Sequence, residues 1–493
     1  MTRPQVIVVG GGNAALCAAI SAAAEGARVT LLERAPEDLR GGNSRFTAGA
    51  MRVVYNGVDD LLKLMPELTP GELERTDFGA YTSDQFYDDL GRVTHYRIDP
   101  ALAEVLVEQS FETLRWMRGE GVRFLPLYGR QSYEVEGKVR FWGGLTVEAW
   151  GGGPGLVDSL TEIAQKRGVV IRYGVRATEL IMAAGRATGV RTESAAGPDD
   201  YHAEAVILAC GGFESSPTWR ARYLGPGWDL ARVRGTRFNT GDGIQMAMDA
   251  GAAARGHWSG CHAVAWDLNA PEYGDLAVGD GFQKHSYPLG ILVNNQGERF
   301  LDEGADFRNY TYAKYGAEIL KQPQQAAWQI FDAKVSGVLR DEYRIREVTR
   351  VQADDLETLA TRMEGVDAPG LLRTIEAFNA AVAEDVPFDP TVKDGRCTRG
   401  LAVPKSNWAN ALDKPPFEAY GVTCGVTFTF GGLHVDEKAR VIAQDGTPIP
   451  GLFAAGELVG GLFYFNYPGG SGLTSGAVFG RIAGRGAAGV GEP

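Results

Sequence analysis

A run of small residues near the start of the sequence, followed by one acidic residue, has the spacing of a phosphate-binding turn. Gly10 permits a tight turn, Gly12 lets the backbone approach a pyrophosphate, and Ala15 keeps the following helix close to the strand before it. Glu33 lies about 20 residues further on, where an acidic side chain takes a ribose hydroxyl. This pattern predicts a dinucleotide site, and the alternative is a tight turn that binds nothing.

The residues around this turn predict the elements that must position it. Val6 to Val9 is a β-branched run typical of a buried strand, and an alanine-rich helical stretch follows it and ends near Gly26. A second strand, from Arg28 to Leu32, ends at Glu33. In such a βαβ unit the helix N-terminus faces the phosphates with unpaired N–H groups and a partial positive charge.

Further elements of the same kind are expected along the chain. Residues 168–172 and 205–209 read as strands, and 59–118 reads as mostly helical, within an elaboration of the first domain that covers about 59–150. Near the end, a short strand at 451–455 leads into a glycine-acid turn, and a last helix opens after Gly470 and continues to about residue 483.

The middle of the chain differs in character and is interpreted as an insertion. From 256 to 423 it is rich in aromatic residues and long loops, with polar helices near 354–363 and 370–382. The expected fold is therefore α/β, with a discontinuous Rossmann-like nucleotide-binding domain formed by 1–255 and 424–493. An α+β capping domain, 256–423, would be inserted in it.

Composition excludes several classes of function. Lys and Arg number 49 against 62 Asp and Glu, a net charge of −13 without a basic run, which argues against binding nucleic acid or anionic membranes. Five scattered cysteines form no CxxC pair, so neither a disulfide framework nor a metal site is indicated. With no long apolar run either, we expect a cytoplasmic chain that does not insert into membranes. The 66 glycines lie in clusters, which suits close approach to a large cofactor.

Short motifs spread over nearly the whole chain carry a resemblance. They are Gly10-Gly11-Gly12, Gly41-Gly42-Asn43-Ser44, Ala209-Cys210-Gly211-Gly212-Phe213, Asn239-Thr240-Gly241-Asp242-Gly243, Gly297-Glu298-Arg299-Phe300 and Ala455-Gly456-Glu457. Together they resemble the flavoproteins of the fumarate reductase and succinate dehydrogenase type, a family that includes 3-ketosteroid dehydrogenases. Within it, segments 9–17, 40–45 and 466–470 are most similar to the tricarballylate dehydrogenase flavoproteins.

The resemblance implies FAD extended across the first domain, with its isoalloxazine between that domain and the cap. Family members with covalent flavin carry a histidine beside the second glycine motif, whereas here Ser44 is followed by Arg45 and Phe46, so noncovalent FAD is expected. A helix opening at 471–473 would direct its N-terminus at the flavin. The implied cofactor contacts are Gly10, Gly12, Asn13, Ala14, Ala15, Glu33, Arg34, Gly41, Gly42, Asn43, Ser44, Val175, Ala209, Gly211, Gly212, Asn239, Gly241, Asp242, Gly456, Glu457, Ser471, Gly472 and Leu473.

The resemblance also implies a proton carrier for chemistry at a saturated carbon pair, which needs a base besides a hydride acceptor. Arg308 follows the Gly297–Phe300 motif, although it lies five residues after Glu303 where four are expected. An arginine is a poor base in water, so Glu303 or Asp306 would serve as relay partners. The alternative is that Arg308 only pairs with a surface carboxylate.

Two further side chains are implied to contact substrate. Tyr467 occupies the position of a substrate-binding arginine in fumarate reductases and of a proton-removing tyrosine in the ketosteroid enzymes; otherwise it is a packed aromatic before Pro468. His262 resembles a cap histidine that holds a substrate carboxylate; otherwise it is an ordinary core histidine. Phe428 stands where a second histidine is expected, which argues against plain dicarboxylates as substrates.

These residues predict an FAD dehydrogenase that desaturates a carbon–carbon bond next to a carboxylate or ketone, with tricarballylate to aconitate as the named expectation. The alternatives are a ketone-activated desaturase of the 3-ketosteroid dehydrogenase type and a fumarate-reductase-like ene-reductase. A flavin electron-transfer or sensor protein is the alternative from another class, and the large aromatic insertion argues against it. Electrons would pass to a separate acceptor protein or a quinone.

Overall fold

The computed structural model describes residues 3–489 as an α/β fold built on a six-stranded sheet of order β20-β21-β13-β1-β2-β9. Neighbouring strands are parallel except β20 and β21. The strands are β1 Gln5–Val9, β2 Arg28–Glu33, β9 Val170–Tyr173, β13 Ala205–Leu208, β20 Arg440–Ile442 and β21 Pro448–Ala454. The strands expected from the sequence are confirmed, and the carboxyl ends of β1 and β2 meet at one edge.

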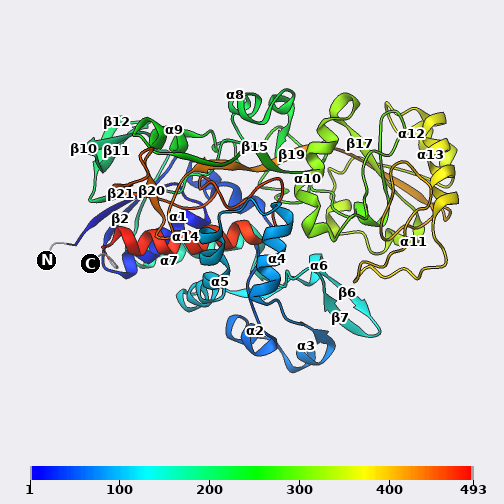
Figure 1. The fold of residues 1–493 in the computed structure, drawn as a ribbon, viewed down its shortest axis with the longest axis horizontal. Coiled ribbons are helices and arrows are strands. Elements are labelled where there is room, and N and C mark those ends of the chain that lie inside the picture. The colour runs from blue at the N-terminus through cyan, green and yellow to red at the C-terminus, as the bar shows by residue number, and fades with distance from the viewer. Residues whose placement is uncertain (1–2, 490–493) are drawn as a thin grey trace.

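Two helices from distant parts of the chain pack closely against each other. α1 (Asn13–Ala24) follows the glycine turn, and α14 (Ser471–Ala487) is the expected last helix; Figure 1 draws them side by side in blue and red. An added Cβ at Gly480 would lie 2.4 Å from the carbonyl oxygen of Ala14, and one at Gly484 2.3 Å from that of Ala18. The two glycines therefore let the helix backbones touch.

The elaboration on the first domain has its long helices in about its first two thirds. α2 (Val58–Leu64), α3 (Pro70–Arg75), α4 (Ser83–Val93) and α5 (Pro100–Glu120) confirm the helices expected over 59–118. Beyond α5 the elaboration is mostly short strands, and Glu136 and Gly137 adopt positive φ where they close a tight hairpin. The short elements are β3 Ala50–Met51, β4 Thr76–Asp77, β5 Phe124–Pro126, α6 Tyr128–Gln131, β6 Ser132–Val135, β7 Lys138–Phe141 and β8 Val147–Ala149.

A second large sheet dominates the middle of the chain. Its centre is the 17-residue strand β19 (Phe417–Leu433), which pairs along its length with β14, β15, β17 and β18. The other members are β14 Arg232–Val233, β15 Ala254–Asp267, β16 Ile291–Asn294, β17 Ala327–Phe331 and β18 Arg350–Ala353. The helices here are α10 Tyr312–Leu320, α11 Ala333–Ser336, α12 Leu356–Arg362 and α13 Ala368–Ala381, of which the last two were expected.

The expected limits of the insertion fall inside β15 and β19, which cross the middle of the molecule in Figure 1. The division into 1–255, 256–423 and 424–493 therefore stays a prediction. The remaining elements are α7 Gly152–Lys166, β10 Arg176–Ala183, β11 Arg186–Ser194, β12 Gly197–His202, α8 Pro217–Trp219 and α9 Asp242–Asp249. The strands among them form an antiparallel three-stranded sheet.

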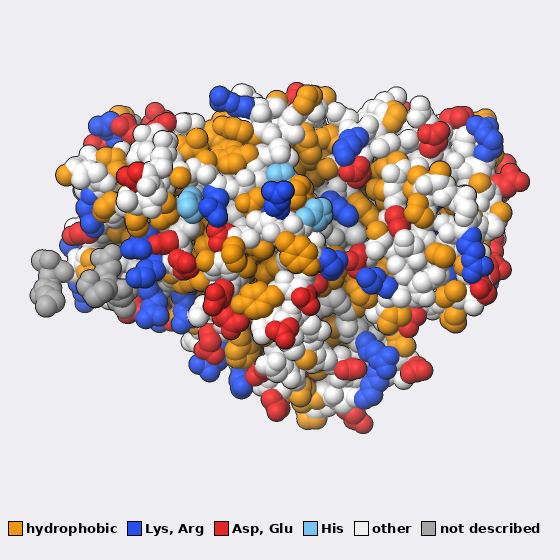
Figure 2. Space-filling view, viewed as in Figure 1, with side chains coloured by type: hydrophobic (Ala, Val, Ile, Leu, Met, Phe, Trp, Pro, Cys, Tyr) orange, Lys and Arg blue, Asp and Glu red, His pale blue; other side chains and the backbone are white. Residues whose placement is uncertain are grey.

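One face of the molecule carries both signs of charge. On the face in Figure 2, basic and acidic side chains are intermixed around hydrophobic areas. Within residues 3–489, no helix combines the length and the apolar character that crossing a membrane requires.

Candidate functional site

A large cavity opens where β1, β2 and β13 end, and it encloses about 1890 Å³ of empty space, open solvent at its mouth included. Most of the expected cofactor contacts line it, together with the three expected catalytic residues, Arg308, Tyr467 and His262. The lining cofactor candidates are Gly10, Gly12, Asn13, Ala14, Glu33, Arg34, Gly42, Asn43, Ser44, Val175, Ala209, Gly211, Asn239, Asp242, Gly456, Glu457, Gly472 and Leu473.

The other expected contacts are not among the residues that line the cavity, and their contact with a cofactor stays a prediction. They are Ala15, Gly41, Gly212, Gly241 and Ser471. Ser471, for example, is fully buried, and its hydroxyl donates to the carbonyl of Pro468 at 2.5 Å. Gly212 lies behind Glu457, whose Oε1 would be 2.2 Å from an added Cβ.

The glycine turn has the geometry of a phosphate site. Gly10 has φ +114°, and an added Cβ would lie 2.3 Å from the carbonyl oxygen of Ala209, so only glycine fits there. α1 begins after Gly12 without a side-chain cap, and its first N–H, from Asn13, donates to Ser44 Oγ at 3.0 Å. The next N–H groups have no partner within the helix and remain available to an anion.

Glu33 lies buried at the end of β2, beside the turn. Its Oε1 accepts a hydrogen bond from the backbone N–H of Ala35 at 2.7 Å, and burial raises its pKa to about 7. Arg34 reaches away from it to Asp242, at 3.1 Å. Asp242 also pairs with Arg176 at 2.8 Å, so this acid closes the edge of the cavity beside Glu33 instead of offering a free carboxylate.

A buried carboxyl pair lies deeper in the same wall. Asn239 Nδ2 donates to Glu214 Oε1 at 2.7 Å and to Glu457 Oε2 at 3.5 Å, and Asn43 Nδ2 donates to Glu214 at 2.6 Å. Burial and the repulsion from Glu214 raise the pKa of Glu457 well above its ordinary value. The two carboxyl groups therefore favour sharing a proton over being ionised together. The sequence analysis missed Glu214, although it lies only two residues after the expected glycine pair.

Arg308 is buried without any carboxylate partner in the described structure. Its Nη2 donates to Gln131 Oε1 at 2.6 Å, and its Nη1 lies 3.4 Å from His285 Nδ1. Burial, with repulsion from Arg340, lowers the pKa of Arg308 to about 9. The alternative of a surface ion pair is therefore wrong.

The acidic relay expected for Arg308 is also wrong. Glu303 is bound to Arg299, at 2.5 Å and 3.0 Å, and Asp306 to Arg92, at 2.5 Å. Both carboxylates are paired with those arginines, and neither is hydrogen-bonded to Arg308. Arg299 lies only four residues before Glu303, so proximity in sequence favours this ion pair as much as a relay to Arg308.

Tyr467 meets a second tyrosine that the sequence analysis missed. The hydroxyls of Tyr467 and Tyr312, at the start of α10, are hydrogen-bonded to each other, and burial raises both pKa values. His262 packs against both rings, with centroids 4.9 Å away, and against Phe428 at 5.2 Å. Neither ring nitrogen of His262 has a hydrogen-bond partner, so it is not an ordinary bonded core histidine.

The positive charge of this region does not come from His262, because burial and Arg234 lower its pKa well below the ordinary value and keep it neutral. Two arginines share one acid instead. Arg234 lies 2.5 Å and Arg130 2.6 Å from the carboxylate oxygens of Asp280. This triad carries a net positive charge, to which Arg308 adds another. The arginines had no motif to reveal them.

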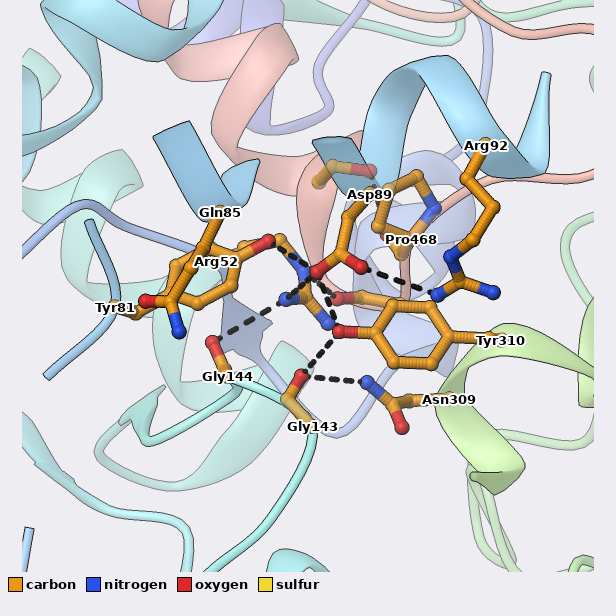
Figure 3. A network of polar contacts seen from close by, with 12 residues as sticks. Arg52, Tyr81, Gln85, Asp89, Arg92, Gly143, Gly144, Asn309, Tyr310 and Pro468 are labelled. Carbon is orange, nitrogen blue, oxygen red and sulfur yellow. Dashed lines mark hydrogen bonds and ion pairs between the residues drawn. The ribbon is translucent and has the colours of Figure 1, made fainter. Parts of the chain in front are cut away.

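A separate network holds the segments that carry these residues (Figure 3). Arg52, fully buried, donates from Nε to the carbonyl of Gly469 at 2.9 Å and lies 3.7 Å from Asp89. The hydroxyl of Tyr310 donates to Asp89 at 2.5 Å, and Gly469 N–H donates to the carbonyl of Asn309 at 2.9 Å. The network thus ties the turn after Tyr467 to the start of α10.

The donor set fits a dinucleotide that carries a redox-active ring. Besides α1, the N-terminus of α14 reaches the cavity, since Gly472 and Leu473 line it and Gly470 leaves the helix start without a side-chain cap. Two uncapped helix starts in one cavity provide partial positive charge for a pyrophosphate and for a ring that becomes anionic on reduction.

Comparisons with known proteins agree with this geometry. A family model described as FAD binding domain matches residues 5–473. Fumarate reductase (cytochrome) of Shewanella frigidimarina is 30% identical over 492 residues, 98% of this chain and 76% of that protein. 4-Oxocyclohexanecarboxylate 2-dehydrogenase of Sinomonas cyclohexanicum is 28% identical over 554 residues, 98% of this chain and 92% of that one. The open conformation of a flavocytochrome c3 fumarate reductase superposes with a TM-score of 0.72 at 27% identity, covering 98% of this chain and 78% of that chain.

The fold and site thus define a flavoprotein with a Rossmann-like domain and an enclosed redox cavity. The chain belongs to the FAD-binding-domain family, among the fumarate reductase flavoproteins and their relatives. It is an FAD-dependent oxidoreductase.

Proposed function

We propose that this protein oxidises or reduces a carbon–carbon bond next to a carbonyl group. The observation that carries the proposal is the meeting of an unpaired buried arginine, Arg308, and the hydroxyl pair of Tyr312 and Tyr467 in the wall of the cavity that holds the cofactor candidates. The names of the fumarate reductase and 4-oxocyclohexanecarboxylate dehydrogenase relatives support chemistry at such a bond.

Tyr467 polarises the substrate carbonyl in this proposal. A phenol in a dry site is a strong donor to an oxygen on which negative charge develops, and its hydrogen bond with Tyr312 holds it in place. His262, neutral and with both ring nitrogens unpaired, donates a second hydrogen bond to the substrate. When bound, FAD exchanges a hydride with one substrate carbon.

Arg308 carries the proton of the neighbouring carbon. Its pKa of about 9 makes the neutral guanidine accessible, and the arginine is otherwise held only by Gln131, the backbone and His285. Because no carboxylate is paired with it, removal or delivery of the proton breaks no ion pair. Exclusion of water by the surrounding aromatic rings keeps the proton between Arg308 and the substrate.

A ketone is our first candidate for the activating group. In fumarate reductases an arginine and a histidine at these positions would hold a plain dicarboxylate. This chain has Tyr467, whose hydroxyl is a neutral donor, at the first position and Phe428 at the second, and both line the cavity. Tricarballylate, converted to aconitate, is the second candidate, favoured by the positive charge of Arg308 and of the Arg130–Asp280–Arg234 triad. Electrons would leave or enter through a separate protein or a quinone.

A substrate screen without oxygen tests the proposal. The flavin-loaded chain is mixed with cyclic ketones, dicarboxylates and tricarballylate and scored by bleaching of flavin absorbance, and the dithionite-reduced chain is mixed with enones, fumarate and aconitate and scored by reoxidation. We expect ketones or enones to react first and Tyr467→Phe to lose that reaction. Absence of bleaching and of reoxidation by every compound refutes the proposed reaction.

A further inference from the structure

A second, smaller cavity adjoins Arg308. It encloses about 360 Å³ of empty space, open solvent included, and lies between the loop after α11, the segment 285–289 and the hairpin region of the first domain. Arg308 belongs to the linings of both cavities, so its side chain separates them. The remaining wall is mostly aromatic and apolar, formed by Tyr133, Trp142, Pro288, Leu289, Phe307, Pro390 and Trp408.

Four nitrogens of the residues around this cavity are buried and without a hydrogen-bond partner. They are Trp142 Nε1, His285 Nε2, Arg308 Nε and Arg340 Nη1. Trp142, His285 and Arg308 are at most 9% exposed. Buried polar atoms in folded proteins are almost always hydrogen-bonded, so four orphans around one space indicate a missing acceptor.

The charges around the cavity specify what that acceptor is. Two guanidinium groups, Arg308 and Arg340, line it, and none of its described lining residues is acidic. Arg340 forms no ion pair within the described chain, and its field lowers the pKa of Arg308. Glu342 lies close enough to act on Arg308 but does not line the space. Like charges brought together in a buried space favour an anion between them.

We propose that this cavity is a carboxylate subsite, in which Arg340, His285 and Trp142 bind an acidic group of the substrate that lies beyond the reacting carbons. The proposal rests on the proposed function for what occupies the larger cavity. It narrows the substrate class to compounds with an activating carbonyl at one end and a carboxylate at the other, long enough to pass Arg308.

Calorimetric titration of the flavin-loaded chain tests the subsite without turnover. The probes are dicarboxylates of four to eight carbons, each paired with the monocarboxylate of the same length. We expect the longer dicarboxylates to bind at least 10-fold more tightly than their monocarboxylate partners, a difference that Arg340→Leu abolishes and Arg340→Lys partly restores. Arg346→Leu, which removes the same charge from an exposed position six residues away, is the matched control and should change nothing.

Sulfate distinguishes a substrate carboxylate from a separate inorganic anion. If the subsite holds the substrate, sulfate competes with the dicarboxylates and not with the monocarboxylates. Sulfate that binds through Arg340 without weakening dicarboxylate binding overturns the assignment to substrate, and so does an unchanged preference in Arg340→Leu. Binding that depends on Arg340 in a chain that reacts with none of the screened compounds would leave the subsite standing and refute the reaction instead.

Discussion

Replacing Arg308 should change the pH dependence of the proton transfer as well as its rate. Its pKa of about 9, against the ordinary 12.5, makes the neutral form roughly 10³-fold more accessible. About one molecule in a hundred is then neutral at pH 7, so the rate of dehydrogenation should rise about tenfold per pH unit and level off near pH 9. Reduction of the double bond needs the protonated form and should fall above that pH.

Two substitutions separate the proton carrier from a merely structural residue. Arg308→Leu removes the carrier and should slow flavin reduction by roughly 10² or more with little loss of substrate binding, because the proton moves only in the transition state. Lysine has an ordinary pKa about two units below that of arginine, and in the same buried site beside Arg340 it stays lower. The plateau for Arg308→Lys should therefore shift towards pH 7.

Stopped-flow reduction of the flavin without oxygen, from pH 6 to 10 and at several substrate concentrations, measures both effects. Arg346→Lys, at an exposed position, is the control and should reproduce the parent profile. A leucine variant that reduces flavin at the parent rate would show that Arg308 carries no proton. So would a lysine variant whose slower rate still levels off near pH 9, because a positioning role alone moves no pKa.

Other consequences can be measured on the same protein. Acid or detergent denaturation should release the flavin into solution, since no histidine stands beside Ser44; flavin that stays on the denatured chain contradicts this. Glu33→Ala should weaken FAD affinity about 10- to 100-fold because a charged hydrogen-bond partner is lost, and the chemistry of the FAD-loaded molecules should change little. In the parent protein, FAD affinity should fall as the pH drops below about 7, where the Glu33 carboxylate is protonated. An equal flavin content across that pH range contradicts the assignment. Tyr467→Phe should weaken binding of ketones more than that of tricarballylate, measured by flavin absorbance; equal effects argue against carbonyl polarisation. Gly480→Ala should destabilise the chain by about 1–3 kcal/mol in thermal unfolding, because the new methyl group meets the α1 backbone. Gly119→Ala is the control and should not destabilise the chain, because its Cβ meets no atom within 4 Å. Equal melting temperatures of the two variants would refute the close packing of α1 and α14.

The first βαβ unit could be predicted because its signals are local. Gly10, Gly12 and Glu33 belong to one turn and the strand that follows it, and β-branched periodicity fixes both neighbours. The long strand β19 was missed, since its 17 residues are buried on both faces and show no alternation. The glycines within β19 are also untypical of a strand, and they favoured the prediction of long loops in this region.

The catalytic region shows a different limit of sequence reasoning. Tyr312, Glu214 and Asp280 become functional candidates only through partners far away in the chain, and no spacing records those contacts. Arg308 illustrates the same point in reverse. Its relay partners were chosen by proximity in sequence, but Glu303 pairs with the nearby Arg299 and Asp306 with the distant Arg92. Sequence motifs therefore predicted where the cavity lies. The ion pairs that set the charge within it became visible only in the three-dimensional structure.

The contact between α1 and α14 has a consequence for biosynthesis. α1 is almost wholly buried, and Gly476, Gly480 and Gly484 of α14 cover it. During translation α1 leaves the ribosome early, whereas α14, which covers it, emerges only after β19 and β21. The phosphate-binding turn and α1 therefore remain partly exposed to solvent while most of the chain is synthesised. FAD is therefore expected to bind stably only after α14 has been synthesised and has packed against α1.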